Sequence, residues 1–204
     1  MTVRFHRGDL PADYAPGAAI AVDTETLGLN PHRDRLCVVQ LSTGDKTADV
    51  VQIVPGGPVP AVLVRVLGDP TTLKIFHFAR FDLAVLSHRL GIMPGPVYCT
   101  KIASKLARTY TDRHGLKDLT RDLLGIDLSK AQQSSDWAAD ELSQAQLDYA
   151  ASDVLHLHGL RERLDFMLAR EGRTELARSC FEFLPTRARL DLLGWAETDI
   201  FAHS

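Results

Sequence analysis

The sequence predicts an α/β domain, because apolar runs of strand length dominate its first half and helical patterns dominate its second. Turn residues separate the early runs at short intervals, which favours antiparallel pairing among them. The 204 residues suit a single domain, and a content of 45% hydrophobic and 24% charged residues is ordinary for a globular protein.

Three apolar runs near the start of the chain predict an antiparallel meander. They cover residues 18–23, 36–41 and 47–54, and short connections rich in turn residues join them. The Pro and Gly residues at 55–58 end the third run, because neither residue type continues a strand well.

The middle of the chain alternates helices with strands. The expected elements are a helix over 59–67, a strand over 73–78, a helix over 79–90 and a short strand over 97–99. Gly91 is placed to close the second of these helices. The prediction is therefore a mixed five-stranded sheet, in which parallel strands follow the meander and helices flank both.

The second half reads as helical. Apolar residues recur with a period of 3.6 over 102–110, 116–124 and a long segment from 143 to 170. Ser143 and Gln146 resemble a capping box at the start of the long helix. A shorter helix is expected over 173–183, interrupted by Pro185.

Composition excludes several classes of protein. The formal net charge of −3 gives no global basic field for gripping long nucleic acid, which favours local recognition or a short substrate. Cys37, Cys99 and Cys180 lie far apart, so neither a disulfide framework nor a zinc site is indicated, and a reducing cytoplasm fits. No segment has the ~20 apolar residues that span a membrane.

Asp23 and Glu25 follow an apolar strand run. Two residues apart in a strand, their side chains point to one face, about 6.6 Å apart along the strand axis. The pair is suited to bind one metal ion or to divide between two. Taken alone, the same pattern also fits a strand end that enters solvent.

Two further carboxylates lie in distinctive settings. Asp82 falls in the first turns of the helix after a strand, where a negative charge is favourable even without a function. Tyr149 and Asp153 are four residues apart and share a helix face. Because close carboxylates repel by roughly 4 kcal/mol per pair, four of them together indicate divalent cations.

These motifs, in this order, resemble the DEDD superfamily of 3′–5′ exonucleases. Tyr-x-x-x-Asp is typical of its tyrosine branch, since the histidine branch places its histidine where this chain has Asp148. Residues 21–29, 130–137 and 149–154 resemble the ribonuclease D family. The segments 75–82, 108–115 and 191–195 are similar to the short NrnC-type nano-RNases.

The resemblance implies a ribonuclease H-like fold and a two-metal site. It implies that Mg²⁺ or Mn²⁺ is bound by Asp23, Glu25, Asp82 and Asp153. Tyr149 would orient the attacking water, because a tyrosine pKa near 10 makes it a poor base. Further substrate contacts are expected from Thr26, Leu27, His77, Phe81, Trp137 and Arg113, although core packing explains Leu27 and Phe81 equally well.

The resemblance to nano-RNases also implies a substrate and an assembly. It implies cleavage of dinucleotides and other very short RNA to 5′-mononucleotides, by a ring-like homo-octamer. We expect residues 1–204 to form one exonuclease domain without the C-terminal helical domains of ribonuclease D. The last ~20 residues either form an oligomerisation tail that packs on another subunit or fold back on the core of their own chain, and their apolar residues are Leu192, Leu193, Trp195, Ile200 and Phe201.

Two alternatives stay open from the sequence. One is an exonuclease that acts on DNA or on longer structured RNA. The other is a non-catalytic nucleic-acid-binding module on a decayed nuclease scaffold. A group of basic residues forms either a solvated face or a phosphate contact, the latter within one subunit or from a neighbouring one: Lys101, Lys105, Arg108, Arg113 and Lys117.

Overall fold

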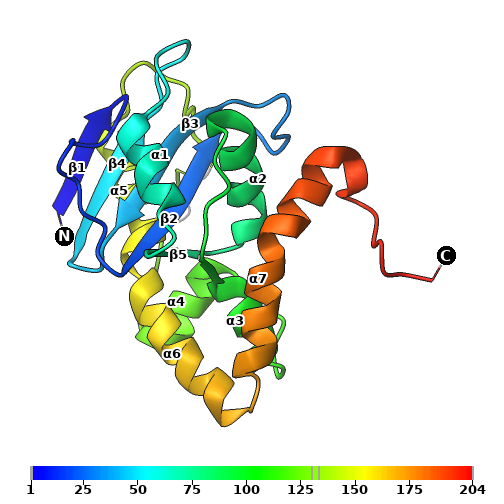
Figure 1. Cartoon of the computed structure of the whole chain (residues 1–204). Helices are drawn as coiled ribbons and strands as arrows, with labels where there is room; N and C mark the ends of the chain where they lie inside the picture. Colours follow the sequence, from blue (N-terminus) through cyan, green and yellow to red (C-terminus); the bar gives the residue numbers. More distant parts are fainter. Residues whose placement is uncertain (1, 130, 133, 204) are drawn as a thin grey trace.

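A mixed six-stranded sheet organises the fold, in the strand order β1–β4–β3–β2–β5–β6 (Figure 1). The computed structural model describes residues 2–129, 131–132 and 134–203. Lys130, part of the segment that resembles ribonuclease D, lies outside them. The strands are β1 (Thr2–Arg7), β2 (Ala19–Thr26), β3 (Leu36–Ser42), β4 (Thr47–Gln52), β5 (Leu73–Phe76) and β6 (Val97–Cys99).

The predicted strand arrangement is confirmed, with one strand more than expected. β2, β3 and β4 form the antiparallel meander, and β5 and β6 extend it in parallel beyond β2. The five-strand prediction missed β1, which pairs in parallel with β4. This strand is largely exposed and charged, and tertiary contacts hold it: Arg4 Nη2 and His6 Nε2 each lie 2.7 Å from the buried Asp49 carboxylate.

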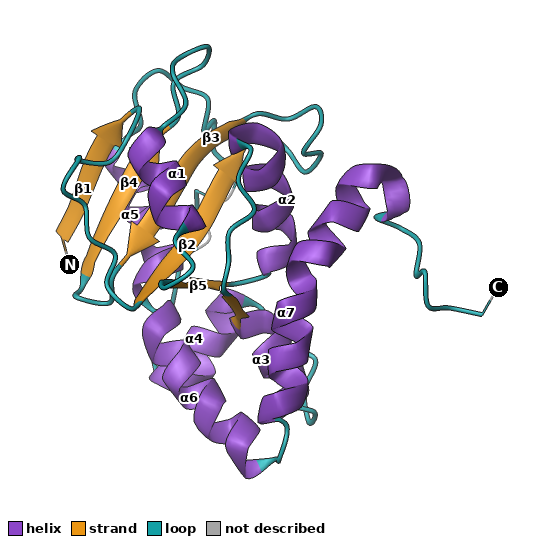
Figure 2. Cartoon of the chain, in the orientation of Figure 1, coloured by secondary structure: helices purple, strands orange, loops and turns teal. Residues whose placement is uncertain are grey.

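Helices cover the sheet in two layers (Figure 2). They are α1 (Ala61–Gly68), α2 (Ala79–Leu90), α3 (Thr100–Ala107), α4 (Leu116–Leu124), α5 (Gln144–Leu155), α6 (Leu157–Arg170) and α7 (Thr174–Leu190). α5 packs across one face, while α1 and α2 lie on the other. α3, α4, α6 and α7 gather beyond the β5–β6 end of the sheet. No described helix has the length and hydrophobicity for a membrane span.

The predicted long helix is two helices. Ser143 and Gln146 do form the expected capping box at its start. The helix then breaks at His156, whose φ of −103° and ψ of −7° depart from helical values. The break lets α5 stay against the sheet while α6 packs on α3 and α4.

Pro185 does not interrupt the last helix, contrary to the prediction. α7 runs through it from Thr174 to Leu190. Phe181, Leu184 and Ala188 are buried on both sides of the proline, so packing offsets the roughly 3 kcal/mol that an internal proline costs. A π-helical turn (Asp191–Trp195) follows, and the chain end then extends away from the body of the molecule.

Candidate active site

Three segments far apart in the sequence bring carboxylates together. Asp23 and Glu25 lie on β2, which begins in the core with Ile20, Ala21 and Val22 fully buried. Asp153 lies on α5, which packs against β2. One carboxylate oxygen from each of these three acids lies within 4.8 Å of the other two. The predicted clustering of these residues is thus observed in the structure.

Asp82 lies beside this group in the first turn of α2. It is 3% exposed, and its Oδ1 accepts a hydrogen bond from Thr24 Oγ1 at 2.7 Å. Thr24 belongs to β2, between Asp23 and Glu25, so the strand itself fixes the fourth carboxylate. Asp82 is close enough for its charge to raise the pKa of Asp23.

Burial and mutual repulsion make these carboxylates reluctant to ionise. Burial is the largest cause in each case: it raises the pKa of Glu25 to about 9 and that of Asp153 to about 7. The pKa of Asp82 also rises to about 7, despite the hydrogen bond from Thr24. The pKa of Asp23 is raised well above its usual value, first by burial and then by the charges of the other three acids.

Hydrogen bonds orient the acids for cation binding. Gln40 on β3 is fully buried, and its Nε2 donates to Asp23 Oδ2 at 2.6 Å. The donor set contains only oxygen atoms, which hard cations such as Mg²⁺ and Mn²⁺ prefer. Positive charge would also offset the repulsion that contributes to the raised pKa values of Asp23 and Glu25. The residues present therefore fit divalent cations.

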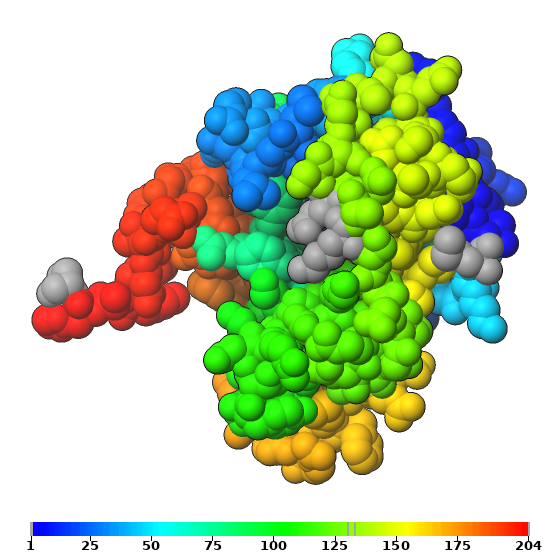
Figure 3. Space-filling view, turned by 180° about the vertical axis from the view of Figure 1, so that it is seen from behind, coloured from blue at the N-terminus to red at the C-terminus, as the bar shows by residue number. Residues whose placement is uncertain are grey.

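A cavity of about 310 Å³ opens onto the carboxylates. Asp23, Glu25 and Asp153 line one side of it, together with Tyr149 and His77. The start of α4 and the loop after it form another part of the lining, with Gly115, Leu116, Lys117, Asp118, Leu128 and Ser129. In Figure 3 the chain that carries α4 and this loop, green to yellow-green, borders α5 in yellow.

Tyr149 and His77 are the aromatic residues of this cavity. Burial, followed by the charges of Asp153, Glu25 and Asp23, raises the pKa of Tyr149, so the phenol stays protonated and can donate a hydrogen bond. Nδ1 of His77 lies 2.9 Å from Thr100 Oγ1. Burial and Lys101 lower the pKa of His77 to about 3, so its ring is neutral at pH 7.

The other predicted substrate residues lie outside this cavity. Thr26 Oγ1 donates to the carbonyl of Gly28 at 2.6 Å, within the turn after β2. Leu27 is 53% exposed, and Arg113 is also exposed. Phe81 lines a second cavity of about 500 Å³ beside α2 and the π-helical turn.

The prediction that Trp137 contacts the substrate is wrong, because Trp137 is a core residue. It is 2% exposed and packs with Cys37, Val38 and Ala150 under α5. Its ring centroid lies 6.0 Å from that of Tyr149. The indole therefore packs near the Tyr149 ring and does not line the cavity of the carboxylates.

The basic residues of α3 do not form one face. Arg108 is 2% exposed and paired with Asp122, so it is neither a solvated residue nor available to a phosphate. Lys101 Nζ lies 4.3 Å from the centre of the Phe78 ring, and Lys105 is exposed. Lys117, on the next helix, lines the cavity beside the carboxylates.

Sequence reasoning missed Thr24, Gln40 and the α4 wall. Gln40 carried a usable signal, because it is a polar residue in the middle of an otherwise apolar strand. The α4 wall carried none, since its position depends on how the second half of the chain folds back over the sheet.

Residues 9–169 match the family model described as 3′-5′ exonuclease. The chain belongs to the 3′–5′ exonuclease family, among the NrnC-type relatives of ribonuclease D. Brucella melitensis NrnC with bound Mg²⁺ is 64% identical, with a TM-score of 0.96 and full coverage of both chains. The Brucella melitensis NrnC structure bound to pGG is 65% identical, with the same TM-score and coverage.

Ribonuclease D proteins are more distant relatives of this exonuclease. The one from Granulibacter bethesdensis is 38% identical over 154 residues, which are 76% of this chain and 38% of that protein. The chain thus matches well under two thirds of the length of this curated relative. Escherichia coli RNase D is 25% identical, with a TM-score of 0.74 over 84% of this chain and 45% of that one.

Proposed function

We propose that this protein is a metal-dependent 3′–5′ exoribonuclease that releases 5′-mononucleotides from short RNA. The observation that carries the proposal is the meeting of Asp23, Glu25 and Asp153 within 4.8 Å, beside Tyr149 in a cavity of about 310 Å³. A cavity of this size lies at the lower end of the range for small-ligand sites. It suits the end of one strand better than a duplex.

Each residue of the site has a definite task in this proposal. Asp23, Glu25, Asp82 and Asp153 hold two divalent cations, Mg²⁺ or Mn²⁺. When bound, such ions supply Lewis-acid chemistry for phosphodiester hydrolysis. Tyr149 remains a protonated phenol and orients the attacking water by a hydrogen bond.

Gln40 and Thr24 keep two of the acids in place. Gln40 holds one oxygen of Asp23, and Thr24 holds one oxygen of Asp82. Each donor satisfies one lone pair and leaves the other carboxylate oxygen for a cation. Outer contacts of this kind commonly fix the orientation of metal ligands.

Short RNA is the substrate class that we propose, with dinucleotides preferred. The relative whose structure contains pGG supports this choice. The neutral ring of His77 suits contact with a base, because it adds no charge to the cavity. Leu27 and Phe81 stay proposed base contacts, Leu27 because its side chain is exposed and Phe81 because it lines the neighbouring cavity.

We further propose one exonuclease domain over residues 1–204, a ring-like homo-octamer and a cytoplasmic location. The apolar C-terminal tail supports the assembly, because Leu193 is 70% exposed and Phe201 is 76% exposed. Side chains of this kind usually mark an interaction surface. The three unpaired cysteines support a reducing compartment.

The test of the function is a side-by-side digestion of pGG, a long RNA and a long DNA, with Mg²⁺ or with a chelator. We expect rapid conversion of pGG to mononucleotides, slow cleavage of the long substrates and no cleavage in chelator. Equal rates on pGG and long RNA would remove the preference for short substrates. Binding of RNA without cleavage would favour a non-catalytic module, and faster cleavage of DNA would favour a DNA exonuclease.

A further inference from the structure

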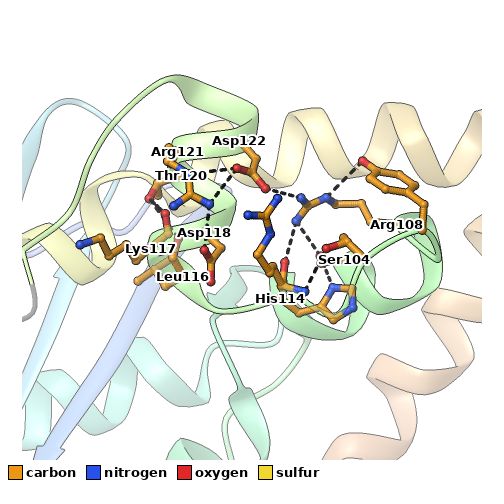
Figure 4. Close-up of polar contacts among 12 residues, drawn as sticks. Ser104, Arg108, His114, Leu116, Lys117, Asp118, Thr120, Arg121 and Asp122 are labelled. Atoms are coloured by element: carbon orange, nitrogen blue, oxygen red, sulfur yellow. Dashed lines mark hydrogen bonds and ion pairs between the residues drawn. The ribbon is translucent and has the colours of Figure 1, made fainter.

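Arg108 is a buried arginine that follows α3 and binds the polypeptide forming one wall of the catalytic cavity. Its Nη2 donates to Asp122 Oδ2 at 2.6 Å, and its Nη1 donates to the carbonyl oxygen of Arg113 at 3.0 Å. Its own amide donates to the carbonyl of Ser104 at 2.8 Å. One residue thus joins the end of α3 to the loop before α4 and to α4 itself (Figure 4).

Further contacts fix the loop between the two helices. Arg108 Nη1 lies 3.5 Å from Ser104 Oγ, which in turn lies 2.8 Å from Nδ1 of His114. Arg108 Nε donates to the hydroxyl of Tyr110 at 3.4 Å, and the guanidinium lies 5.9 Å from the centre of that ring. The loop is therefore held in its first half by Tyr110 and at its end by Arg113 and His114.

The same network reaches the catalytic cavity. Asp122 Oδ1 accepts from Arg121 Nη2 at 3.1 Å, and that nitrogen also donates to Asp118 Oδ1 at 2.9 Å. Asp118 lines the cavity together with Gly115, Leu116 and Lys117. Figure 4 shows Lys117 pointing away from the network. A chain of contacts therefore runs from the buried arginine to the cavity wall.

Apolar packing holds one face of α4, because Leu119 is fully buried and Leu116, Leu123 and Leu124 pack partly buried against the core. The polar contacts act at the start of this helix, where no described side chain caps Gly115. A buried guanidinium is costly unless it is paired, so the Arg108–Asp122 contact has to be maintained in the folded state. Although burial raises the pKa of Asp122, hydrogen bonds from Arg121 and Arg108 hold it below its usual value. Asp122 is therefore ionised at neutral pH.

We propose that Arg108 is a positioning residue for the substrate, which holds the α4 wall at the distance from the carboxylates that a short RNA requires. It acts through Asp122 and the Arg113 carbonyl, and it touches neither the cavity nor the acids. This inference rests on the exoribonuclease function proposed above. Because the wall residues are not in the acidic cluster, Arg108 governs substrate affinity and leaves metal binding unchanged.

The test compares Arg108→Lys, Asp122→Asn and the double variant in steady-state cleavage of pGG with Mg²⁺. We expect KM to rise about tenfold or more in each single variant, because a small displacement of a binding wall is costly. We expect kcat and the Mg²⁺-induced rise in Tm to stay within about twofold of wild type. The double variant should match the larger single effect, since both changes break one contact.

Arg173→Lys is the matched control. Arg173 Nη1 donates to the carbonyl of Leu106 at 2.6 Å, so it also holds the end of α3, but from α7 and away from α4. The KM of the Arg173→Lys variant should equal that of wild type. Should Arg108→Lys fail to fold, Asp122→Asn decides, because asparagine removes the ion pair at this 21% exposed position but keeps a side-chain oxygen that can accept from the guanidinium.

Three results would overturn the inference. They are an unchanged KM in folded variants, a fall in kcat alone, and an equal rise in KM for Arg173→Lys. Failure of the wild-type protein to cleave pGG is a different result, because it rejects the proposed function and the inference falls with it. If wild type cleaves pGG and the folded variants have the wild-type KM, only the inference about Arg108 is rejected and the proposed function stands.

Discussion

The metal-free protein should become more stable when one carboxylate of the acidic cluster is neutralised. Asp153→Asn removes a buried acid whose folded-state pKa is about 7, against an ordinary value of 3.8. Each pH unit between the two values corresponds to about 1.4 kcal/mol, so ionised Asp153 destabilises the fold by at most about 4 kcal/mol. Since the acids share their repulsion and the hydrogen bond to Tyr149 weakens, we expect a net gain of about 2–3 kcal/mol at pH 8.

The sign of this effect depends on pH. A carboxyl group with a raised folded-state pKa destabilises the fold at every pH where the unfolded chain releases the proton more readily than the folded chain does. The penalty is absent below about pH 4, grows as the pH rises, and is complete above about pH 7. The advantage of Asp153→Asn should therefore be present at pH 8 and vanish near pH 4.

The assay is thermal unfolding in chelator and in Mg²⁺. For a protein of this size each kcal/mol shifts Tm by about 2–4 °C, which predicts a rise of about 4–12 °C for Asp153→Asn in chelator at pH 8. Mg²⁺ at a hundred times its Kd should stabilise wild type by about 2.7 kcal/mol and the variant by much less.

Asp148→Asn is the control for this experiment. It lies on the same helix, is exposed and stays outside the cluster, so its Tm should be within the small range of surface changes. A Tm below that of wild type for Asp153→Asn in chelator at pH 8 would show that ionised Asp153 does not destabilise the metal-free fold. An equal rise in Tm of both variants with Mg²⁺ would show that Asp153 does not bind the cation.

Three further predictions concern neighbours of the acids. Tyr149→Phe should lower kcat about a hundredfold and leave the Mg²⁺-induced rise in Tm intact, and normal turnover would remove Tyr149 from the mechanism. Gln40→Leu should weaken Mg²⁺ binding about 10–100-fold by calorimetry, and wild-type affinity would show that its bond to Asp23 is dispensable. Trp137→Ala should cost about 3–5 kcal/mol of unfolding free energy in urea, and a small loss would contradict its place in the core.

Local patterns predicted the parts of the molecule that local physics determines. The spacing of Asp23 and Glu25 put both on one face of a strand, and that of Tyr149 and Asp153 put both on one face of a helix. The structure places all four side chains in one cavity. Gly91 closes α2 in the left-handed conformation, as a helix-terminating glycine does.

Long-range contacts determine what the sequence could not reveal. β1 exists because β4 and Asp49 hold a charged edge strand, and α7 continues through Pro185 because the core holds both of its halves. Trp137 and Arg108 are residue types common at nucleic-acid surfaces, yet folding buries both. Their surroundings come from segments distant in the sequence, so spacing carried no information about them.

Hydrolysis of short RNA by the carboxylate cluster is the activity that we propose for this protein. The most direct measurement is release of mononucleotide from pGG in Mg²⁺ by wild type, Asp23→Asn and Asp148→Asn. Asp148 occupies the place of the histidine in the other branch of these exonucleases, and its variant should keep the wild-type rate. Asp23→Asn should lose about a thousandfold or more. A wild-type rate for Asp23→Asn, with both variants folded, would show that the carboxylate cluster is not the site of hydrolysis.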